Sequence, residues 1–175
     1  GIGVAEKIGN YAQFPSLALA NSAIAFISQN IGAKNYDRVK VIIKDLVWMS
    51  SLATLIAVIL MYIFAPYAVA LFNNDSEVIM HGTKMSRIIA SSFLLLNLSH
   101  IYNGANRAAH NVNAPMIIAI ITQCIIKYLF VYLGLKAHYS YEVLYYGTAV
   151  GFSFAGILAT LYFYLSKKTQ DLHLR

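Results

Sequence analysis

The stretch LVWMSSLATLIAVILMYIFAPYAVALFNN, residues 46–74, contains no charged side chain. The hydrocarbon core of a bilayer is about 30 Å thick, and an α-helix needs roughly 20 apolar residues to cross it. Residues 46–74 exceed that length. Helices buried in soluble proteins rarely stay free of charge for so long, so this stretch predicts a membrane-spanning helix.

Four further charge-free runs occur, at residues 8–33, 88–106, 108–126 and 143–166. The whole chain is 59% hydrophobic and 11% charged, whereas soluble domains are roughly 45–50% apolar and 25% charged. We therefore predict an all-α fold, a polytopic bundle of transmembrane helices. The five expected spans cover about residues 8–31, 43–65, 85–106, 114–135 and 143–166.

Lysine and arginine are unevenly distributed between the two faces that five such spans would present. One face carries eight of them: Lys34, Arg38, Lys40, Lys44, Arg107, Lys167, Lys168 and Arg175. The other face carries four: Lys7, Lys84, Arg87 and Lys136. Because cytoplasmic loops are enriched in basic residues, we expect the first face and the C-terminus on the cytoplasmic side of a plasma membrane. The net charge of +6 then reflects orientation and contact with anionic membrane lipid, and we expect no nucleic-acid partner.

Several functional classes are disfavoured by motifs that the sequence lacks. It has no G-x-S-x-G, Walker A or H-E-x-x-H motif, so we expect no catalytic residue, cofactor or metal ligand and no enzymatic activity. Any pumping is then expected to use an ion gradient. The single cysteine, Cys124, cannot form an internal disulfide. The chain opens at Gly1 with neither a signal peptide nor a starting methionine, so we expect Gly1 to be an interior position of a longer protein.

The segment ANSAIAFISQNIGAKNYDRVKVIIK, residues 20–44, joins a helix rich in small residues to a polar turn and a basic loop. The turn reads Gln29, Asn30, Ile31, Gly32 and Ala33. We expect Gly32 to end the helix and to take a positive φ at little cost. The side chains of Gln29 and Asn30 would bond to backbone groups that the helix end leaves free. We interpret this turn as a structural or hinge-like element.

A second segment, IYNGANRAAHNVNAPMIIAII at residues 101–121, ends one span and begins the next. Pro115 stands in the expected first turn of a helix, where proline is best tolerated. Arg107 can donate to the last carbonyls of the preceding helix while staying at the membrane edge.

The two segments together resemble the multidrug and toxic compound extrusion (MATE) family. The family resemblance implies a fold of two pseudo-symmetric lobes with six helices each. The polar tail SKKTQDLHLR and the basic Lys127 are similar to the end of the second lobe and to its fifth helix. On that match, residues 1–175 form the C-terminal transmembrane lobe, helices eight to twelve, and helix seven and the N-terminal lobe are missing.

Polar side chains inside the expected spans are the candidates for lining a transport cavity. They are Asn97, His100, Gln123 and Lys127. Hydrogen bonding between helices is the alternative role for Asn97, His100 and Gln123, whereas Lys127 could instead snorkel outward or pair with a carboxylate of the missing half. No Asp or Glu falls within the five cores. Because cation coupling requires an intramembrane carboxylate, the resemblance places that group in the missing half.

The expected function is secondary active efflux of drugs or organic cations by antiport with H⁺ or Na⁺, through alternating access between two lobes. The expected partners are amphipathic or cationic small molecules, membrane lipid, and the N-terminal lobe of the same parent chain. Two alternatives stay open. One is a flippase for lipid-linked oligosaccharides from the same superfamily, which should carry more basic residues in its cavity. The other is a truncated fragment that does not transport.

Overall fold

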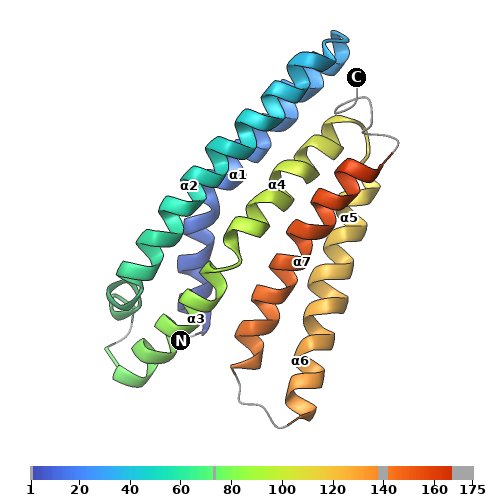
Figure 1. The fold of residues 1–175 in the computed structure, drawn as a ribbon. Coiled ribbons are helices and arrows are strands. Elements are labelled where there is room, and N and C mark those ends of the chain that lie inside the picture. Colours follow the sequence, from blue (N-terminus) through green and yellow to red (C-terminus); the bar gives the residue numbers. More distant parts are fainter. Residues whose placement is uncertain (1, 73, 138–141, 167–175) are drawn as a thin grey trace.

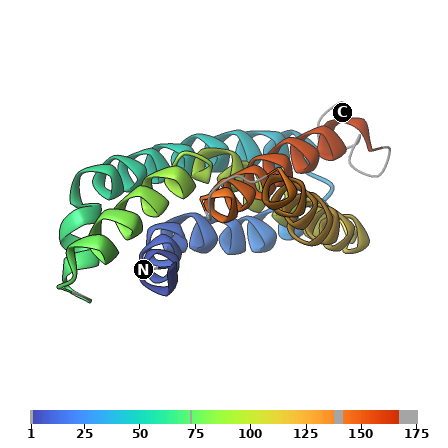
Figure 2. The same cartoon turned by 90° about the horizontal axis from the view of Figure 1, so that it is seen from below.

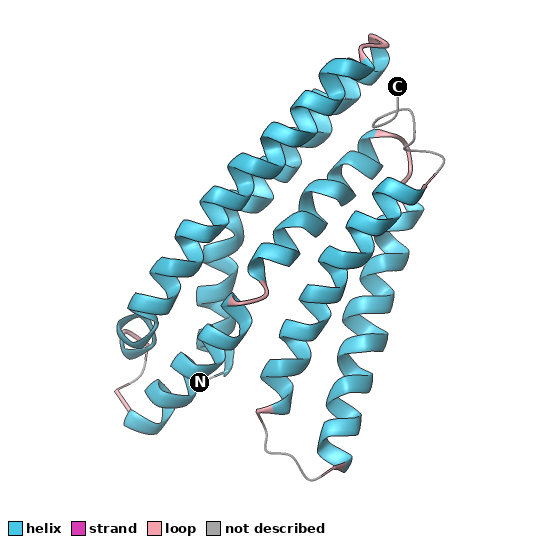
Figure 3. Ribbon diagram, viewed as in Figure 1, coloured by secondary structure: helices cyan, strands magenta, loops and turns pink. Residues whose placement is uncertain are grey.

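The computed structural model describes residues 2–72, 74–137 and 142–166, with side chains described for Lys7 and from Gly9 onward. These residues form eight helical segments and no strand: α1 (Ile2–Gly32), α2 (Tyr36–Ala70), α3 (Ser76–Ala90), α4 (Phe93–Ala108), α5 (Asn113–Ala119), the π-helical segment η1 (Ile120–Ile126), α6 (Lys127–Lys136) and α7 (Val143–Leu165). The predicted all-α bundle is confirmed, as Figure 3 shows. The basic tail residues Lys167, Lys168 and Arg175 lie outside the described part.

Four of the five expected spans correspond to continuous helical rods. They are α1, α2, the rod formed by α5, η1 and α6, and α7. α1, α2 and the α5–α6 rod extend beyond the predicted bounds, whereas α7 ends one residue before its predicted end. Residues 85–106, expected as one span, do not form one continuous helix, because α3 and α4 are separate helices with a visible break between them (Figure 1).

The break lies at the adjacent serines Ser91 and Ser92. The Ser91 hydroxyl donates to the carbonyl of Ile88 at 2.6 Å, and the Ser92 hydroxyl donates to that of Ile89 at 2.7 Å. Serine hydroxyls that bond to nearby carbonyls compete with the helical ladder, and serine pairs are a recognised cause of sharp kinks. The pair therefore separates α3 from α4.

α3 and α4 run in the same direction, and with that pair counted as one rod the successive rods alternate in direction (Figure 1). The α1–α2 turn, the α4–α5 loop and the end of α7 lie together at the top of that view. Lys34 and Arg107 belong to this end, whereas Lys84 and Lys136 belong to elements that approach the opposite end. Figure 2 shows the α5–α6 rod beside α7, and α1 packs directly against α2 (Figure 1). This alternation is the one that the charge distribution requires.

Two apolar clusters form the interior. The first joins α1, α2, α4, α5 and α7, with Ile27, Val39 and Phe163 at its centre. The second joins α2, α3, α4 and α7, with Phe93 and Tyr145 among its members. Along α1, α2 and α4, a set of buried polar side chains lies between these clusters, and that set is part of the candidate site described below.

The outer surface is strongly apolar. Large hydrophobic side chains are exposed along α2, α6 and α7; Trp48 on α2 is 71% exposed. Apolar patches of this extent on a soluble protein mark interaction surfaces, and on a helix of sufficient length they are suited to lipid. Three rods of the described chain are long and apolar enough to cross a membrane by length and composition: residues 36–70, 113–136 and 143–165. The α1 helix has the length but is less apolar, and the serine break leaves α3 and α4 with 15 and 16 residues.

Glycines on α7 allow two neighbours to approach closely. A Cβ added at Gly147 would lie 2.5 Å from Val131 of α6, and one at Gly151 would lie 3.2 Å from the Thr122 carbonyl of η1. A Cβ at Gly156 would overlap the backbone of Leu95 in α4. Small residues commonly permit such contacts between membrane helices. The α7 helix therefore packs almost backbone to backbone against both the α5–α6 rod and α4.

Candidate functional site

Asn97 joins three helices through buried hydrogen bonds. Its amide nitrogen donates to the hydroxyls of Ser50 at 3.0 Å and Ser51 at 3.3 Å on α2, and its oxygen accepts from Ser16 on α1. Asn97 is 1% exposed. In this conformation its amide makes interhelical hydrogen bonds and does not face an open cavity. The bonds fix α1, α2 and α4 relative to one another.

Further along α4, three buried polar atoms have no hydrogen-bond partner among the described residues: His100 Nε2, Asn103 Oδ1 and Asn106 Oδ1. The amide nitrogens of the two asparagines bond within α4, to Ser99 Oγ at 3.0 Å and to the Tyr102 carbonyl at 2.9 Å. Unpaired buried polar atoms are uncommon in native interiors. Between Asn97 and the end of α4, the helix therefore carries three buried polar atoms that no described residue satisfies.

Gln123 and Lys127 lie at the π-helical segment η1. The Lys127 amide bonds back to the Thr122 carbonyl, and the Thr122 hydroxyl bonds to the Ile118 carbonyl at 2.8 Å. Gly151 of α7 packs here, because a Cβ at that position would lie 3.3 Å from Lys127 Cβ and 3.4 Å from Gln123 Oε1. Segments of π-helix inside α-helices often mark functional sites. The segment determines how Gln123 and Lys127 are directed from their rod.

Lys127 lines a polar cavity of about 180 Å³ between α1, α3, α4, α6 and α7. The cavity also contains Asn10, Gln13 and Thr148, and its apolar walls include Phe93 and Phe152. Of the four residues predicted to line a cavity, Lys127 lies in one, Asn97 and His100 lie between packed helices, and Gln123 contacts α7. The structure thus places Gln123 and Lys127 together against Gly151 and leaves Asn97 and His100 on α4.

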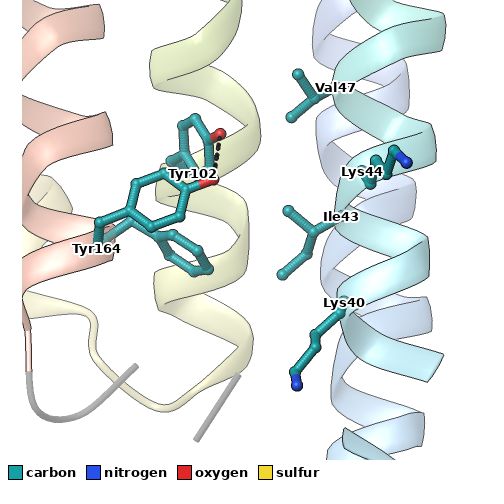
Figure 4. A pocket seen from close by; sticks show the side chains of 7 residues that line it. Lys40, Ile43, Lys44, Val47, Tyr102 and Tyr164 are labelled. Carbon is teal, nitrogen blue, oxygen red and sulfur yellow. Dashed lines mark hydrogen bonds between the residues drawn. The ribbon is translucent and has the colours of Figure 1, made fainter. Parts of the chain in front are cut away.

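A second cavity, of about 340 Å³, lies between α2 and the pair formed by α4 and α7. Figure 4 shows Tyr102 and Tyr164 facing Ile43 and Val47 across the gap, with the two phenol oxygens 3.4 Å apart. The Lys44 ammonium group points away from the tyrosines (Figure 4). The cavity is therefore an apolar groove with lysines at its edge, near the end of the bundle where α2 begins.

The polar turn after α1 ends the helix at Gly32, as predicted, but the left-handed residue is Lys34, with φ of 56°. The Lys34 amide bonds to Ile31 O at 2.9 Å and the Asn35 amide to Asn30 O at 2.9 Å, the two bonds of a Schellman motif. The prediction of a positive φ at Gly32 was wrong, because the motif closes two residues later. A Cβ added at Gly32 would meet nothing within 4 Å.

The side chains of this turn contribute little to its closure. The Asn30 side chain donates to the Phe26 carbonyl at 2.8 Å, one turn earlier. Gln29 is exposed, and only its backbone carbonyl takes part, accepting from the Ala33 amide at 3.1 Å. The turn is held by main-chain bonds, in keeping with a structural role.

The α4–α5 loop repeats the same motif. His110 is left-handed, with φ of 58°, and its amide bonds to Arg107 O at 3.0 Å while that of Asn111 bonds to Asn106 O at 2.9 Å. Arg107 Nε donates to the Asn103 carbonyl at 3.3 Å, as expected for a basic residue at a helix end. Pro115 is the third residue of α5 and lies in its first turn, as expected.

The acidic side chains that the structure describes lie near helix ends, except for Asp45, which is the tenth residue of α2. Asp37, Asp45, Asp75 and Glu77 are exposed, and Glu142 accepts from Lys84 at 2.5 Å between α3 and the start of α7. Its hydrogen bond to Glu142 raises the pKa of Lys84 above the ordinary 10.5. The described spans therefore hold no buried carboxylate, and no cluster of metal-ligating side chains occurs among these residues.

Comparison with known proteins agrees with this geometry. The family model MatE matches residues 1–133. The chain belongs to the MatE family. Two proteins of Bacillus subtilis (strain 168) are similar to it: Probable multidrug resistance protein YoeA, 29% identical over 118 residues, and Probable multidrug resistance protein YpnP, 23% identical over 163 residues. These alignments cover 67% and 93% of this MatE chain but 26% and 36% of the relatives.

A solved structure confirms the fold. The inward-facing conformation of a multidrug resistance MATE family transporter of the MOP superfamily superposes with a TM-score of 0.81 at 16% identity. The superposition covers 90% of this chain and 37% of that structure. With its apolar helices, the MatE chain is a multi-pass membrane protein that spans about a quarter to a third of the length of the curated relatives it matches.

Sequence reasoning missed the partners that complete these sites. Ser16, Ser50 and Ser51 surround Asn97, and Asn10 and Thr148 lie with Lys127. Serine and threonine in a membrane helix commonly bond to their own backbone, so residue type alone did not distinguish them.

Proposed function

We propose that this MatE chain is part of a multidrug exporter that moves drugs or organic cations out of the cell in exchange for H⁺ or Na⁺. The observation that carries the proposal is the family match over residues 1–133, together with relatives named as multidrug resistance proteins. The absence of an ATP-binding motif from the sequence favours an ion gradient as the energy source. The proposed role is that of a transporter and not of an enzyme.

The helices of this chain are proposed to act as one rigid lobe, corresponding to family helices eight to twelve. The Asn97 hydrogen bonds and the α7 glycine contacts both favour rigid movement, because they join helices that would otherwise slide separately. Alternating access would then come from rocking against a partner lobe of the same parent protein. Coupling is proposed to use a carboxylate in that partner lobe, since the described spans bury none.

The proposed setting is a plasma membrane with the end that carries Lys34, Arg107 and the end of α7 in the cytoplasm. The alternating direction of the helices supports this arrangement, because it collects the described members of the larger basic set at that end. Contact with anionic lipid is proposed for the same side chains.

The flippase alternative is less favoured. It called for several basic residues in a central cavity, and Lys127 is the one basic residue among the described residues that line the polar cavity. The alternative of a truncated, non-transporting chain concerns the parent protein, and expression of the complete coding sequence separates it from the exporter.

The test is ethidium efflux from cells that lack their main efflux pumps and express the complete parent protein. We expect efflux that stops when a protonophore or removal of Na⁺ collapses the coupling gradient. Expressed and inserted protein that exports no cationic dye would refute the proposal and would favour the flippase.

A further inference from the structure

The Lys127 cavity has the composition of a ligand site, and none of the residues that the structure describes pairs with its charge. Lys127 forms no hydrogen bond or ion pair with any residue that the structure describes; its nearest aromatic contact is the Tyr128 ring, 5.9 Å from the ammonium nitrogen. None of the described residues lining the cavity is acidic. A lysine held among membrane helices without a counter-charge is unfavourable, so an anionic group in this cavity would stabilise it.

The surrounding side chains suit an anion attached to an apolar body. The exposed Asn10 amide has no hydrogen bond to another described residue, and the Gln13 amide holds only a long bond of 3.4 Å to the Gly9 carbonyl. Both amides can therefore donate to an oxyanion beside Lys127. On the other side, Phe93 and Phe152 form a tilted aromatic pair with ring centroids 6.3 Å apart. A few convergent polar groups on an apolar wall are typical of small-molecule sites.

The lysine is directed into this cavity by its backbone. It is the first residue after η1, and Gly151 of α7 packs against it. A Cβ added at Gly151 would lie 3.3 Å from the Cβ of Lys127. The stem of Lys127 is therefore confined between η1 and α7, which limits how far the ammonium group can snorkel. A volume of about 180 Å³ accommodates a carboxylate and part of the ring that bears it, but not a whole drug molecule.

We propose that this cavity binds the carboxylate of exported amphipathic compounds, with Lys127 as the counter-charge and Phe93 and Phe152 against the adjoining apolar part. The inference rests on the proposed export function and names a substrate class for it: zwitterionic or acidic compounds beside the cationic ones. Lys127 then determines specificity, because it favours molecules that carry an acid over their neutral analogues.

The experiment uses two dyes that differ only at the carboxylate, rhodamine B and its ethyl ester. The complete parent protein is purified in detergent, and binding of each dye is measured by fluorescence polarisation at a fixed pH. Lys127→Gln removes the charge with little change in size, and Lys127→Arg keeps it. Lys136→Gln is the matched control, since it makes the same charge change at the exposed end of the same helix.

We expect Lys127→Gln to weaken binding of the free acid about tenfold and to leave the ester within about twofold, because the loss is confined to the charged pair. The Lys127→Arg variant should retain tighter binding of the acid than Lys127→Gln, and Lys136→Gln should bind both dyes as the wild type does. Equal binding of the acid by wild type and Lys127→Gln would overturn the proposal. An equal loss of both dyes would also overturn it, since it would indicate that Lys127 pairs with an acidic side chain elsewhere in the parent protein.

Failure of this inference is distinguishable from failure of the export function. Binding is measured without transport, whereas export is measured as gradient-driven efflux of the ester and of ethidium, which lack the carboxylate. If the wild type exports these cations but does not bind the free acid more tightly through Lys127, the export function is supported and the anion site is refuted.

Discussion

Replacement of Asn97 by alanine should destabilise the bundle without touching an open cavity. The substitution removes two donated bonds to α2 and one accepted from α1. Interhelical hydrogen bonds in membranes average about 0.6 kcal/mol and reach about 1.7. The loss of three such bonds should therefore lower the free energy of unfolding by about 2 kcal/mol. The Ser50 hydroxyl is not left unpaired, because it keeps its own bond to the Val47 carbonyl at 3.2 Å.

The measurement is reversible unfolding of the purified parent protein in mixed micelles, followed by the fluorescence of Trp48 or by circular dichroism. Asn103→Ala is the matched control on the same helix, because its amide makes one bond, to Ser99 within α4. Its expected cost is about 0.5 kcal/mol, the low end for a single hydrogen bond. If the two variants are equally stable and only Asn97→Ala loses transport, the packing role is refuted. Asn97 would then be a residue that contacts the substrate.

Three further predictions concern packing, backbone and charge. A methyl group at Gly156 would overlap the α4 backbone, so Gly156→Ala should lower the stability by about 1–3 kcal/mol. Gly32→Ala is the control, because a methyl group there meets open space. Equal melting temperatures of the two variants would contradict this prediction. His110→Gly should raise stability by up to about 1 kcal/mol, since it relieves a left-handed residue, and a lower melting temperature would count against it. Because the pKa of Lys84 is raised, its pairing with Glu142 stabilises the protein fully below pH 10.5, and this stability is lost as the pH rises above that value. The stability lost in Glu142→Gln should therefore shrink at high pH, and a loss that does not change with pH would contradict the pairing.

The helices could be predicted from the sequence because their signal is local. Charge-free runs such as residues 46–74 exceed the length of a membrane crossing, and the structure places a helix at each of the five runs. The exception, the break at Ser91–Ser92, also had a local signal, since a serine pair offers hydroxyls that compete with the helical ladder. That signal was outweighed by the absence of charge around it.

The details of the site depended on contacts between distant residues. The partners of Asn97 lie 81 and 47 positions away along the chain, and only the packed bundle brings them together. The π-helical turn before Lys127 has no recognisable sequence pattern, and its neighbour Gly151 lies on a different helix, α7. Likewise, the turn after α1 was recognised, but the residue that takes the positive φ is set by where the two closing bonds form.

The central claim, that this MatE chain belongs to an ion-coupled exporter, is tested most directly in proteoliposomes containing the complete parent protein. Ethidium is enclosed with DNA so that its movement changes fluorescence, and a proton or sodium gradient is imposed across the membrane. The account predicts dye movement that starts with one of the two gradients, reverses when that gradient is reversed, and persists in Lys136→Gln. Movement that is the same with and without any imposed gradient, or none in correctly inserted protein, would contradict it.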